Sequence, residues 1–273
     1  MIARSYLFVP ADRPERFAKA LAAGADVVII DLEDAVAPDA KSAARDALSN
    51  WFVSCPDTAA QAGVQIMLRI NGADTKWFHD DVELAADHAV TAVMLPKAAE
   101  IEPLREVITR THARRVLPLV ETAGGITAAR KLARQPGVFR LVLGTVDLQL
   151  DLDIEGDGDE LLAFRSELVL ASRLANIVAP ADGIETVIDD VDALAAATRR
   201  ARRLGFGAKL CIHPRQVATV NAGFSPTPEA LDWARRVIAA SAAAGGAAVA
   251  VDGKMVDAPV IARARRLLDV AHR

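Results

Sequence analysis

The sequence predicts a (β/α)8 barrel with a C-terminal extension. Short apolar runs recur about eight times along the 273 residues, and segments rich in Ala, Arg and Leu separate them. Continuous, β-branched runs are typical of parallel strands that are buried on both faces. Their regular alternation with helices at this length favours a barrel. The alternative, a doubly wound open sheet, is disfavoured because no GxGxxG turn follows the first run.

The strands are expected where the apolar runs lie. In chain order they are Tyr6–Val9, Val27–Ile30, Gln65–Ile70, Ala92–Leu95, Arg115–Val120, Leu141–Leu143, Asn176–Ala179 and Lys209–Ile212. Between them, residues 13–23 predict a helix with Asp12 as its N-cap and Gly24 after its end. Residues 190–204 predict another, with one apolar face and Gly205 as its stop.

Residues 1–222 are predicted to form the barrel, and residues 223–273 the extension. Within the extension, Pro226–Gly245 and Ala258–His272 are typical of helices, and residues 247–253 indicate a β-hairpin arm or a loop. A barrel closes without such an extension. We therefore expect it to contribute to a subunit interface.

Composition narrows the class of protein. The net charge is −4 and the pI about 5.8, so the chain has no excess of positive charge for a nucleic-acid-binding face. Its apolar runs are too short to span a bilayer, and no signal-peptide pattern follows Met1. Cys55 and Cys211 stand outside any CxxC pattern, which indicates reduced thiols and neither a disulfide framework nor a zinc site. We expect a cytoplasmic protein that binds neither nucleic acid nor membrane.

Charged or polar residues follow nearly every predicted strand. The carboxyl ends of barrel strands form one mouth, where active sites lie. Glu121 and Asp147 follow adjacent strands, and two close carboxylates are costly unless a cation lies between them. Oxygen ligands suit a hard ion, which predicts a Mg²⁺ or Mn²⁺ site. Taken alone, Asp34 and Lys97 are interpreted as loop or cap residues, and His213 as a packed histidine.

Eight short motifs lie between about residue 4 and about residue 262. They are Arg4–Pro10 with Arg13, Asp31–Val36 with Lys41 and Arg45, Leu68–Asn71, Leu95–Lys97, Val120–Ile126, Gly144–Leu148, Ile212–Val217 and Gly253–Pro259. In this order they resemble the motifs of the HpcH/HpaI aldolase and citrate lyase beta-subunit family, in its coenzyme A ester lyase branch. Each motif is weak by itself, but chance does not preserve eight in order.

The resemblance implies a barrel fold, a divalent metal and assembly as a homotrimer. It implies that Glu121 and Asp147 hold the metal and that Arg69 binds substrate. In the coenzyme A ester lyases of the family, an Asp near the C-terminus reaches into the neighbouring subunit's site, and Asp257 matches that position. This role would account for the C-terminal extension.

One segment departs from the family pattern. Thr145 and Val146 stand where citrate lyase beta subunits usually have Ala-Glu. The stretch 151–160 that follows is crowded with acidic residues but lacks the EF-hand ligand spacing, so we interpret it as a solvated loop. The departure leaves the metal pair intact and argues against citryl-CoA as the substrate.

The predicted function is cleavage of a short β-hydroxyacyl-CoA, of the citramalyl-CoA or malyl-CoA type, to acetyl-CoA and a 2-keto acid. The metal ion would act as a Lewis acid. Arg69 would hold a carboxylate or enolate oxygen, and Asp257 would transfer the proton. Backbone amides at Gly124 and Gly125 would bind the keto-acid carboxylate, and Arg13 the coenzyme's phosphates. Three alternatives stay open: a malyl-CoA thioesterase, a citryl lyase or non-catalytic subunit of a citrate lyase complex, and a coenzyme-A-independent metal aldolase.

Overall fold

The computed structural model describes residues 3–54, 63–88, 90, 92–111, 113, 115–244 and 248–271. It divides into two compact units, one formed by Ala3–Asn221 and the other by the chain from Ala222 onward. Cys55 lies outside the described residues, whereas Cys211 is a buried free thiol. Among the described helices, none has the length and apolar character that crossing a bilayer requires.

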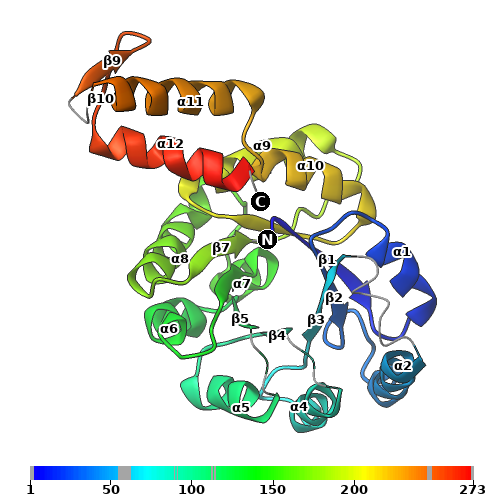
Figure 1. Cartoon of the computed structure of the whole chain (residues 1–273). Coiled ribbons are helices and arrows are strands. Elements are labelled where there is room, and N and C mark those ends of the chain that lie inside the picture. Colours follow the sequence, from blue (N-terminus) through cyan, green and yellow to red (C-terminus); the bar gives the residue numbers. More distant parts are fainter. Residues whose placement is uncertain are drawn as a thin grey trace. The chain divides into compact units, whose positions relative to one another are not determined.

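The first unit is a closed barrel of eight parallel strands, which confirms the predicted fold class. Its strands follow one another in sequence order around the barrel (Figure 1). They are β1 (Ser5–Pro10), β2 (Val27–Asp31), β3 (Gln65–Arg69), β4 (Ala92–Leu95), β5 (Arg115–Val120), β6 (Arg140–Leu143), β7 (Val178–Asp182) and β8 (Ala208–Cys211).

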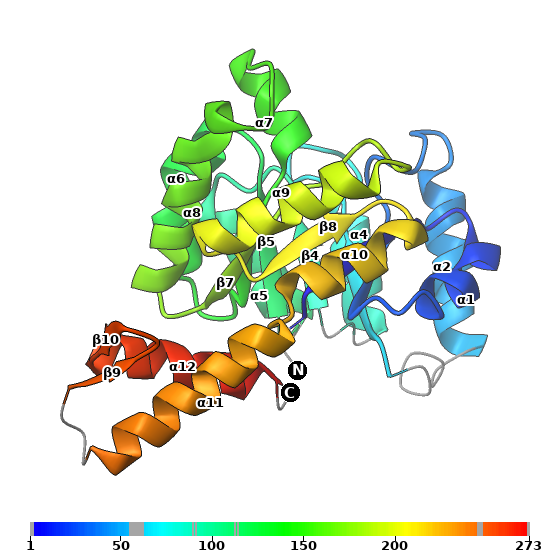
Figure 2. The ribbon, with the colours of Figure 1, turned by 90° about the horizontal axis from the view of Figure 1, so that it is seen from above.

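Helices surround the strands, as the alternating pattern predicts (Figure 1). In the barrel unit they are η1 (Pro14–Arg16), α1 (Phe17–Leu21), α2 (Lys41–Ser54), α4 (Phe78–Asp87), α5 (Ile101–Thr111), α6 (Ala123–Ala133), α7 (Thr145–Leu152), η2 (Asp159–Leu161), α8 (Leu162–Leu174), α9 (Val191–Leu204) and the first part of α10 (Pro214–Phe224). Helix α7 stands apart from this ring, at one end of the barrel (Figure 2).

The interior of the barrel is filled by every second residue of the strands, because successive side chains point to opposite faces. This apolar cluster includes Tyr6, Val27, Ile29, Met67, Ala92, Met94, Leu117, Leu119, Val142, Ala181, Ala208 and Leu210. The same alternation carries Asp31, Arg69 and Glu121 toward the interior at the carboxyl ends of their strands. Asp31 and Arg69 are also register partners on neighbouring strands. The barrel thus presents polar side chains above an apolar core.

Two local predictions need correction. The seventh strand runs from Val178 to Asp182, not over residues 176–179. It continues past the apolar run because fully buried Asp182 is paired with Arg165 Nε at 2.9 Å and with Lys209 Nζ at 3.4 Å. The first helix does not use Asp12 as its N-cap: it begins as a 3-10 turn at Pro14, with no side-chain cap.

The other helix predictions were more accurate. Helix α9 is capped by Asp190, whose Oδ1 accepts from the Ala193 N–H at 2.9 Å, and it ends at Gly205 with φ 104°. In the second unit, helix α11 lies within the predicted range 226–245, and Thr227 caps it by accepting from the Ala230 N–H at 3.2 Å.

The second unit consists of the end of α10, two helices and a hairpin: α11 (Pro228–Ala243), β9 (Val249–Val251), β10 (Lys254–Val256) and α12 (Ala258–Ala271). Its small core contains Ala234, Val237, Val256 and Ala264. The antiparallel strands β9 and β10 confirm the hairpin alternative, although the hairpin extends beyond residue 253.

Candidate active site

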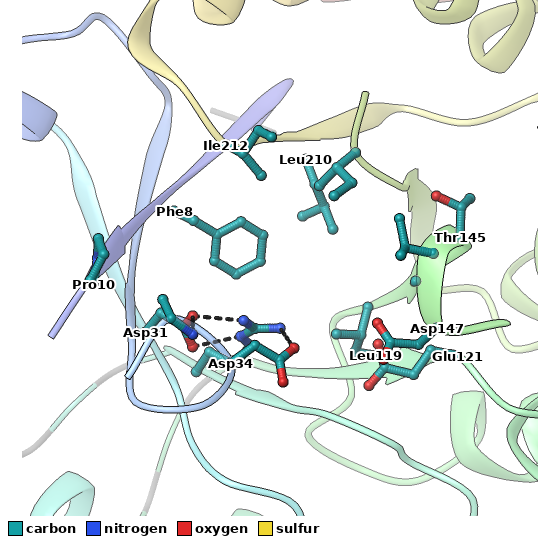
Figure 3. Close-up of a pocket in the computed structure, with 15 residues that line it drawn as sticks. Phe8, Pro10, Asp31, Asp34, Leu119, Glu121, Thr145, Asp147, Leu210 and Ile212 are labelled. Carbon is teal, nitrogen blue, oxygen red and sulfur yellow. Dashed lines mark hydrogen bonds and ion pairs between the residues drawn. The ribbon is translucent and has the colours of Figure 1, made fainter. Parts of the chain in front are cut away.

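The carboxyl ends of the barrel strands enclose a cavity of about 390 Å³ (Figure 3). Volumes of roughly 300–1,000 Å³ are usual for small-molecule sites. The lining residues are Phe8, Pro10, Asp31, Asp34, Ala35, Arg69, Leu119, Glu121, Gly144, Thr145, Val146, Asp147, Ile184, Leu210 and Ile212. The structure therefore brings together Arg69, Glu121 and Asp147, which the sequence placed at one mouth.

Arg69 ends β3, and three carboxylates surround its guanidinium. Its Nε and Nη2 donate to the two oxygens of Asp31 at 2.7 and 2.6 Å. Its Nη1 lies 2.9 Å from Glu33 Oε2 and 3.4 Å from Asp34 Oδ2. Burial alone would lower the pKa of Arg69, but the charges of these carboxylates raise it. Arg69 is thus a positive charge whose guanidinium group is held in place by contacts with all three carboxylates.

Glu33 and Lys97 form a second polar layer beside Arg69. Lys97 Nζ lies 3.3 Å from Glu33 Oε1. Burial raises the pKa of Glu33 to about 7; the charge of Arg69 opposes this shift and that of Asp34 reinforces it. Burial alone would lower the pKa of Lys97, but the charge and hydrogen bond of Glu33 raise it.

The backbone of Lys97 has φ 48°, in the left-handed region that only a few per cent of residues other than glycine adopt. Its N–H donates to Glu121 Oε1 at 2.7 Å. Lys97 lies in a turn, as its interpretation as a loop or cap residue expects, but that interpretation was incomplete because Lys97 also contacts both Glu33 and Glu121. Unusual backbone angles of this kind cluster at functional sites.

Glu121 follows β5 and is only 2% exposed. Burial raises its pKa to about 8, and the negative charges of Glu33 and Asp147 add to the shift. Its carboxylate packs directly over Gly144, where a Cβ would collide with both Oε2 and Cβ of Glu121. A residue without a side chain at position 144 is therefore what allows Glu121 to take this position.

Asp147 lies in the first turn of α7, and its carboxylate is beside that of Glu121 (Figure 3). The helix N-terminus favours a negative charge there. The donor set fits a hard divalent cation, because Mg²⁺ is usually held by one or two carboxylates and keeps water or substrate oxygens as its other ligands. Across the described residues, no group of three or more His, Cys, Asp or Glu side chains could hold a metal. Such an ion would therefore depend on this pair.

The other side of the cavity is apolar. Phe8, Leu210 and Ile212 lie together on the side away from Glu121 and Asp147 (Figure 3). Phe8 also covers Arg69, whose guanidinium carbon is 4.7 Å from the ring centre. The cavity thus has one acidic side and one hydrocarbon side.

Three predicted substrate contacts lie outside the cavity lining. Arg13 precedes η1, and 55% of its side chain is exposed. Gly124 and Gly125 lie in the first turn of α6, as predicted for a helix N-terminus. The Gly125 N–H donates to Thr122 Oγ1 at 3.0 Å, so the helix cap already uses it. Ligand binding by these residues stays a prediction.

Asp257 belongs to the C-terminal unit and immediately precedes α12. It is exposed, and its Oδ1 accepts from the Val260 N–H at 3.3 Å, as an N-cap does. Its predicted role in proton transfer stays a prediction.

The acidic stretch 151–160 is not simply a solvated loop. Asp151 lies on α7 and accepts from the Ala123 N–H at 2.7 Å, which ties α7 to α6. Asp157 pairs with Arg165 at 2.5 Å and with Arg200 at 2.6 Å. These contacts anchor the segment that follows the helix carrying Asp147.

The sequence predictions assigned no role to Asp31, Glu33 or Gly144, although all three lie within the motifs quoted above. Asp31 had a usable signal, because it and Arg69 are opposite charges at the ends of neighbouring strands. No feature of the sequence indicated the role of Gly144, because the need for a glycine there depends on how closely the Glu121 side chain approaches. The interpretation of Asp34 as a loop or cap residue was incomplete, since Asp34 also reaches Arg69.

The family model and the similar sequences point to the same protein family. The model of the HpcH/HpaI aldolase/citrate lyase family matches residues 4–214. A citrate lyase subunit beta-like protein of Mycobacterium tuberculosis is 40% identical over 270 residues, which cover 96% of this chain and 93% of the relative. A (3S)-malyl-CoA thioesterase of Cereibacter sphaeroides is 34% identical over 271 residues, which cover 97% of this chain and 93% of the relative.

Solved structures agree with the sequence relatives. Protein CitE from Mycobacterium tuberculosis, in complex with magnesium, acetoacetate and coenzyme A, superposes with a TM-score of 0.85 at 37% identity and covers 100% of this chain and 99% of its own. A citrate lyase beta subunit from the same organism, complexed with oxaloacetate and magnesium, has a TM-score of 0.72 at 36% identity. The match covers 82% of this chain and 98% of that structure's chain.

Proposed function

Because the chain belongs to the HpcH/HpaI aldolase/citrate lyase family, we propose that it is a Mg²⁺-dependent carbon–carbon lyase. Its substrate is a short β-hydroxyacyl-CoA, which it cleaves to acetyl-CoA and a 2-keto acid. The observation that carries the proposal is the pair Glu121 and Asp147, side by side in the barrel mouth with Arg69 in the same cavity (Figure 3).

Glu121 and Asp147 would hold the ion, and relatives solved with magnesium support its identity. When bound, the ion supplies Lewis acidity at the substrate's hydroxyl oxygen, where negative charge develops as the bond breaks. Mn²⁺ has the same ligand preference and would substitute.

Arg69 would hold a substrate oxygen in the cavity. Asp31 accepts from Nε and Nη2, Glu33 and Asp34 face Nη1, and Nη2 carries one further hydrogen that can be donated to substrate. Since Asp31 and Glu33 fix the guanidinium in place, Arg69 is positioned before the substrate arrives. Such preorganised positive charge stabilises an enolate oxygen without rearrangement.

The reaction needs two proton transfers. The hydroxyl loses its proton, the carbon–carbon bond breaks, and the enolate of acetyl-CoA gains a proton at carbon. We assign the second transfer to Asp257 of a neighbouring copy in a homotrimer, on the resemblance of its motif. An exposed carboxylate on a separate unit is compatible with that role.

A thioesterase activity is the second candidate, because relatives at 34% identity are (3S)-malyl-CoA thioesterases. The two reactions differ in products. Cleavage gives a 2-keto acid and acetyl-CoA, whereas hydrolysis gives a free thiol and a hydroxy acid.

The experiment is to incubate the purified protein with Mg²⁺ and each of citramalyl-CoA, malyl-CoA and citryl-CoA, and to follow keto acid and thiol separately. Keto acid without early thiol is expected. Thiol without keto acid would show a thioesterase and refute the lyase. Asp147→Asn should abolish turnover while leaving the melting temperature of the metal-free protein nearly unchanged. A sizing run would separate a trimer from a subunit of a larger complex.

A further inference from the structure

The two sides of the cavity differ in what they can accept. On the acidic side, Asp31, Asp34, Glu121 and Asp147 line the cavity. Arg69 is the one cation among the described lining residues, and its contacts with Asp31, Glu33 and Asp34 already balance it. A divalent ion at Glu121 and Asp147 would be neutralised by that pair, so the first substrate carboxylate already adds an unbalanced negative charge. No cation of the described lining is left for a second substrate carboxylate.

The hydrocarbon side is formed by Phe8, Leu210 and Ile212, and Ile184 and Leu119 also line the cavity. Leu210 and Leu119 are buried in the barrel core, and Phe8 and Ile184 pack against it. A carboxylate placed against this surface would lose part of its hydration and meet no charged partner in Phe8, Leu210 or Ile212, which is unfavourable. An alkyl group placed there would gain by leaving water.

The geometry of the substrate determines which group meets this surface. The carbon that carries the hydroxyl also carries the carboxylate, the thioester arm and one further substituent. Under the proposed function, the hydroxyl and the carboxylate are directed to the acidic side. The thioester arm must leave through the mouth, because a cavity of about 390 Å³ accommodates only the acyl end of a coenzyme A ester. The remaining substituent is left to face the hydrocarbon side.

We propose that Phe8, Leu210 and Ile212 are specificity-determining residues, which select substrates whose further substituent is a small alkyl group. A thioester that releases pyruvate or 2-oxobutyrate should be preferred over one that releases oxaloacetate. The inference depends on the proposed lyase function and narrows its substrate class.

The expected discrimination follows from the chemistry of the substituent. One methyl or methylene group in a hydrophobic pocket changes kcat/KM by roughly 10- to 200-fold. We therefore expect citramalyl-CoA to be cleaved at least about 10-fold more efficiently than malyl-CoA, which has hydrogen in place of the methyl. Citryl-CoA, which carries a carboxymethyl group, should be poorer than citramalyl-CoA by on the order of 100-fold or more.

Ile212 offers the sharpest test, because it is 36% exposed and a longer side chain can be accommodated there. Ile212→Lys would keep a hydrocarbon stem against the surface and place an ammonium where the second carboxylate would lie. We expect it to lower kcat/KM for citramalyl-CoA and raise it for citryl-CoA, shifting their ratio about 100-fold. The matched control Ile212→Met should leave the ratio within about threefold, since it conserves volume and polarity. Melting temperatures of both variants check that they fold.

Wild-type protein that cleaves citryl-CoA as efficiently as citramalyl-CoA would overturn the inference while leaving the lyase function standing. A ratio that Ile212→Lys leaves unchanged would also overturn it. If none of the three thioesters is cleaved, the proposed function fails, and binding then tests the inference alone. Calorimetry in Mg²⁺ should give pyruvate and 2-oxobutyrate a tighter Kd than oxaloacetate in the wild type, with the order reversed in Ile212→Lys. If the wild type binds oxaloacetate more tightly than pyruvate and 2-oxobutyrate, the proposed selection for a small alkyl group is refuted.

Discussion

Replacing Gly144 by alanine tests the assignment of the metal pair without removing either carboxylate. A Cβ at position 144 would overlap both Oε2 and Cβ of Glu121. Glu121 cannot retreat easily, because its Oε1 accepts from the Lys97 N–H at 2.7 Å and its side chain is 2% exposed. Overpacking of this kind typically costs about 1–3 kcal/mol. If displacement of the Glu121 carboxylate absorbs that energy, Mg²⁺ binding should weaken by about 5- to 150-fold.

The assay is a calorimetric titration of Mg²⁺ into Gly144→Ala, together with a thermal melt. Gly24→Ala is the matched control. Gly24 has φ 77° and no neighbour within 4 Å, so alanine there introduces backbone strain but no collision with the site. The control should lose stability by about 1 kcal/mol with unchanged Mg²⁺ affinity. Wild-type Mg²⁺ affinity in Gly144→Ala would refute the proposal that Glu121 holds the metal in this position.

Three other predictions follow from the same contacts. Mg²⁺ affinity should rise with pH up to about pH 8, because Glu121, whose pKa is raised to about 8, must lose its proton before it binds the ion. Calorimetry in two buffers measures the protons released on binding, and a pH-independent affinity would contradict the prediction. Lys97→Gly should melt about 2–4 °C above Lys97→Ala, since only glycine adopts φ 48° without strain; equal melting temperatures would contradict the strain. Asp182→Asn should lose about 3–5 kcal/mol of stability by leaving Arg165 and Lys209 buried and unpaired, whereas a denaturant midpoint near the wild type's would contradict this. In the wild type this contribution is present above the ordinary aspartate pKa and is lost as the pH falls through the lowered pKa of folded Asp182.

The strands and most helices could be predicted because their cause is local. Inward-facing residues such as Ile29, Met94 and Leu117 are apolar, and so are their neighbours, so each strand appears as a continuous run. The seventh strand broke the rule because Asp182 is charged, and its burial depends on Arg165 and Lys209 from other elements. A single sequence does not reveal such distant partners, and the predicted strand therefore stopped short.

The site divides in the same way. Glu121, Asp147 and Arg69 were accessible from the sequence because the ends of barrel strands converge on one mouth. The role of Lys97 was not, because it depends on a left-handed turn that aims a backbone N–H at Glu121. The hydrocarbon side escaped notice for a different reason: Phe8 and Leu210 resemble ordinary core residues, and only the structure shows that they also line the cavity.

The electrostatics of the mouth also link metal binding to stability. Burial raises the pKa of Glu33 to about 7 and that of Glu121 to about 8, so both carboxyls hold protons more tightly in the folded chain than in the unfolded one. Their contribution therefore favours folding least at high pH, where the folded state must carry both charges in a buried place. A divalent cation between Glu121 and Asp147 relieves that repulsion and binds the folded state alone. Mg²⁺ should consequently raise the melting temperature more at pH 8 than at pH 6, because at pH 8 the ion balances buried carboxylates whose charges repel each other without it.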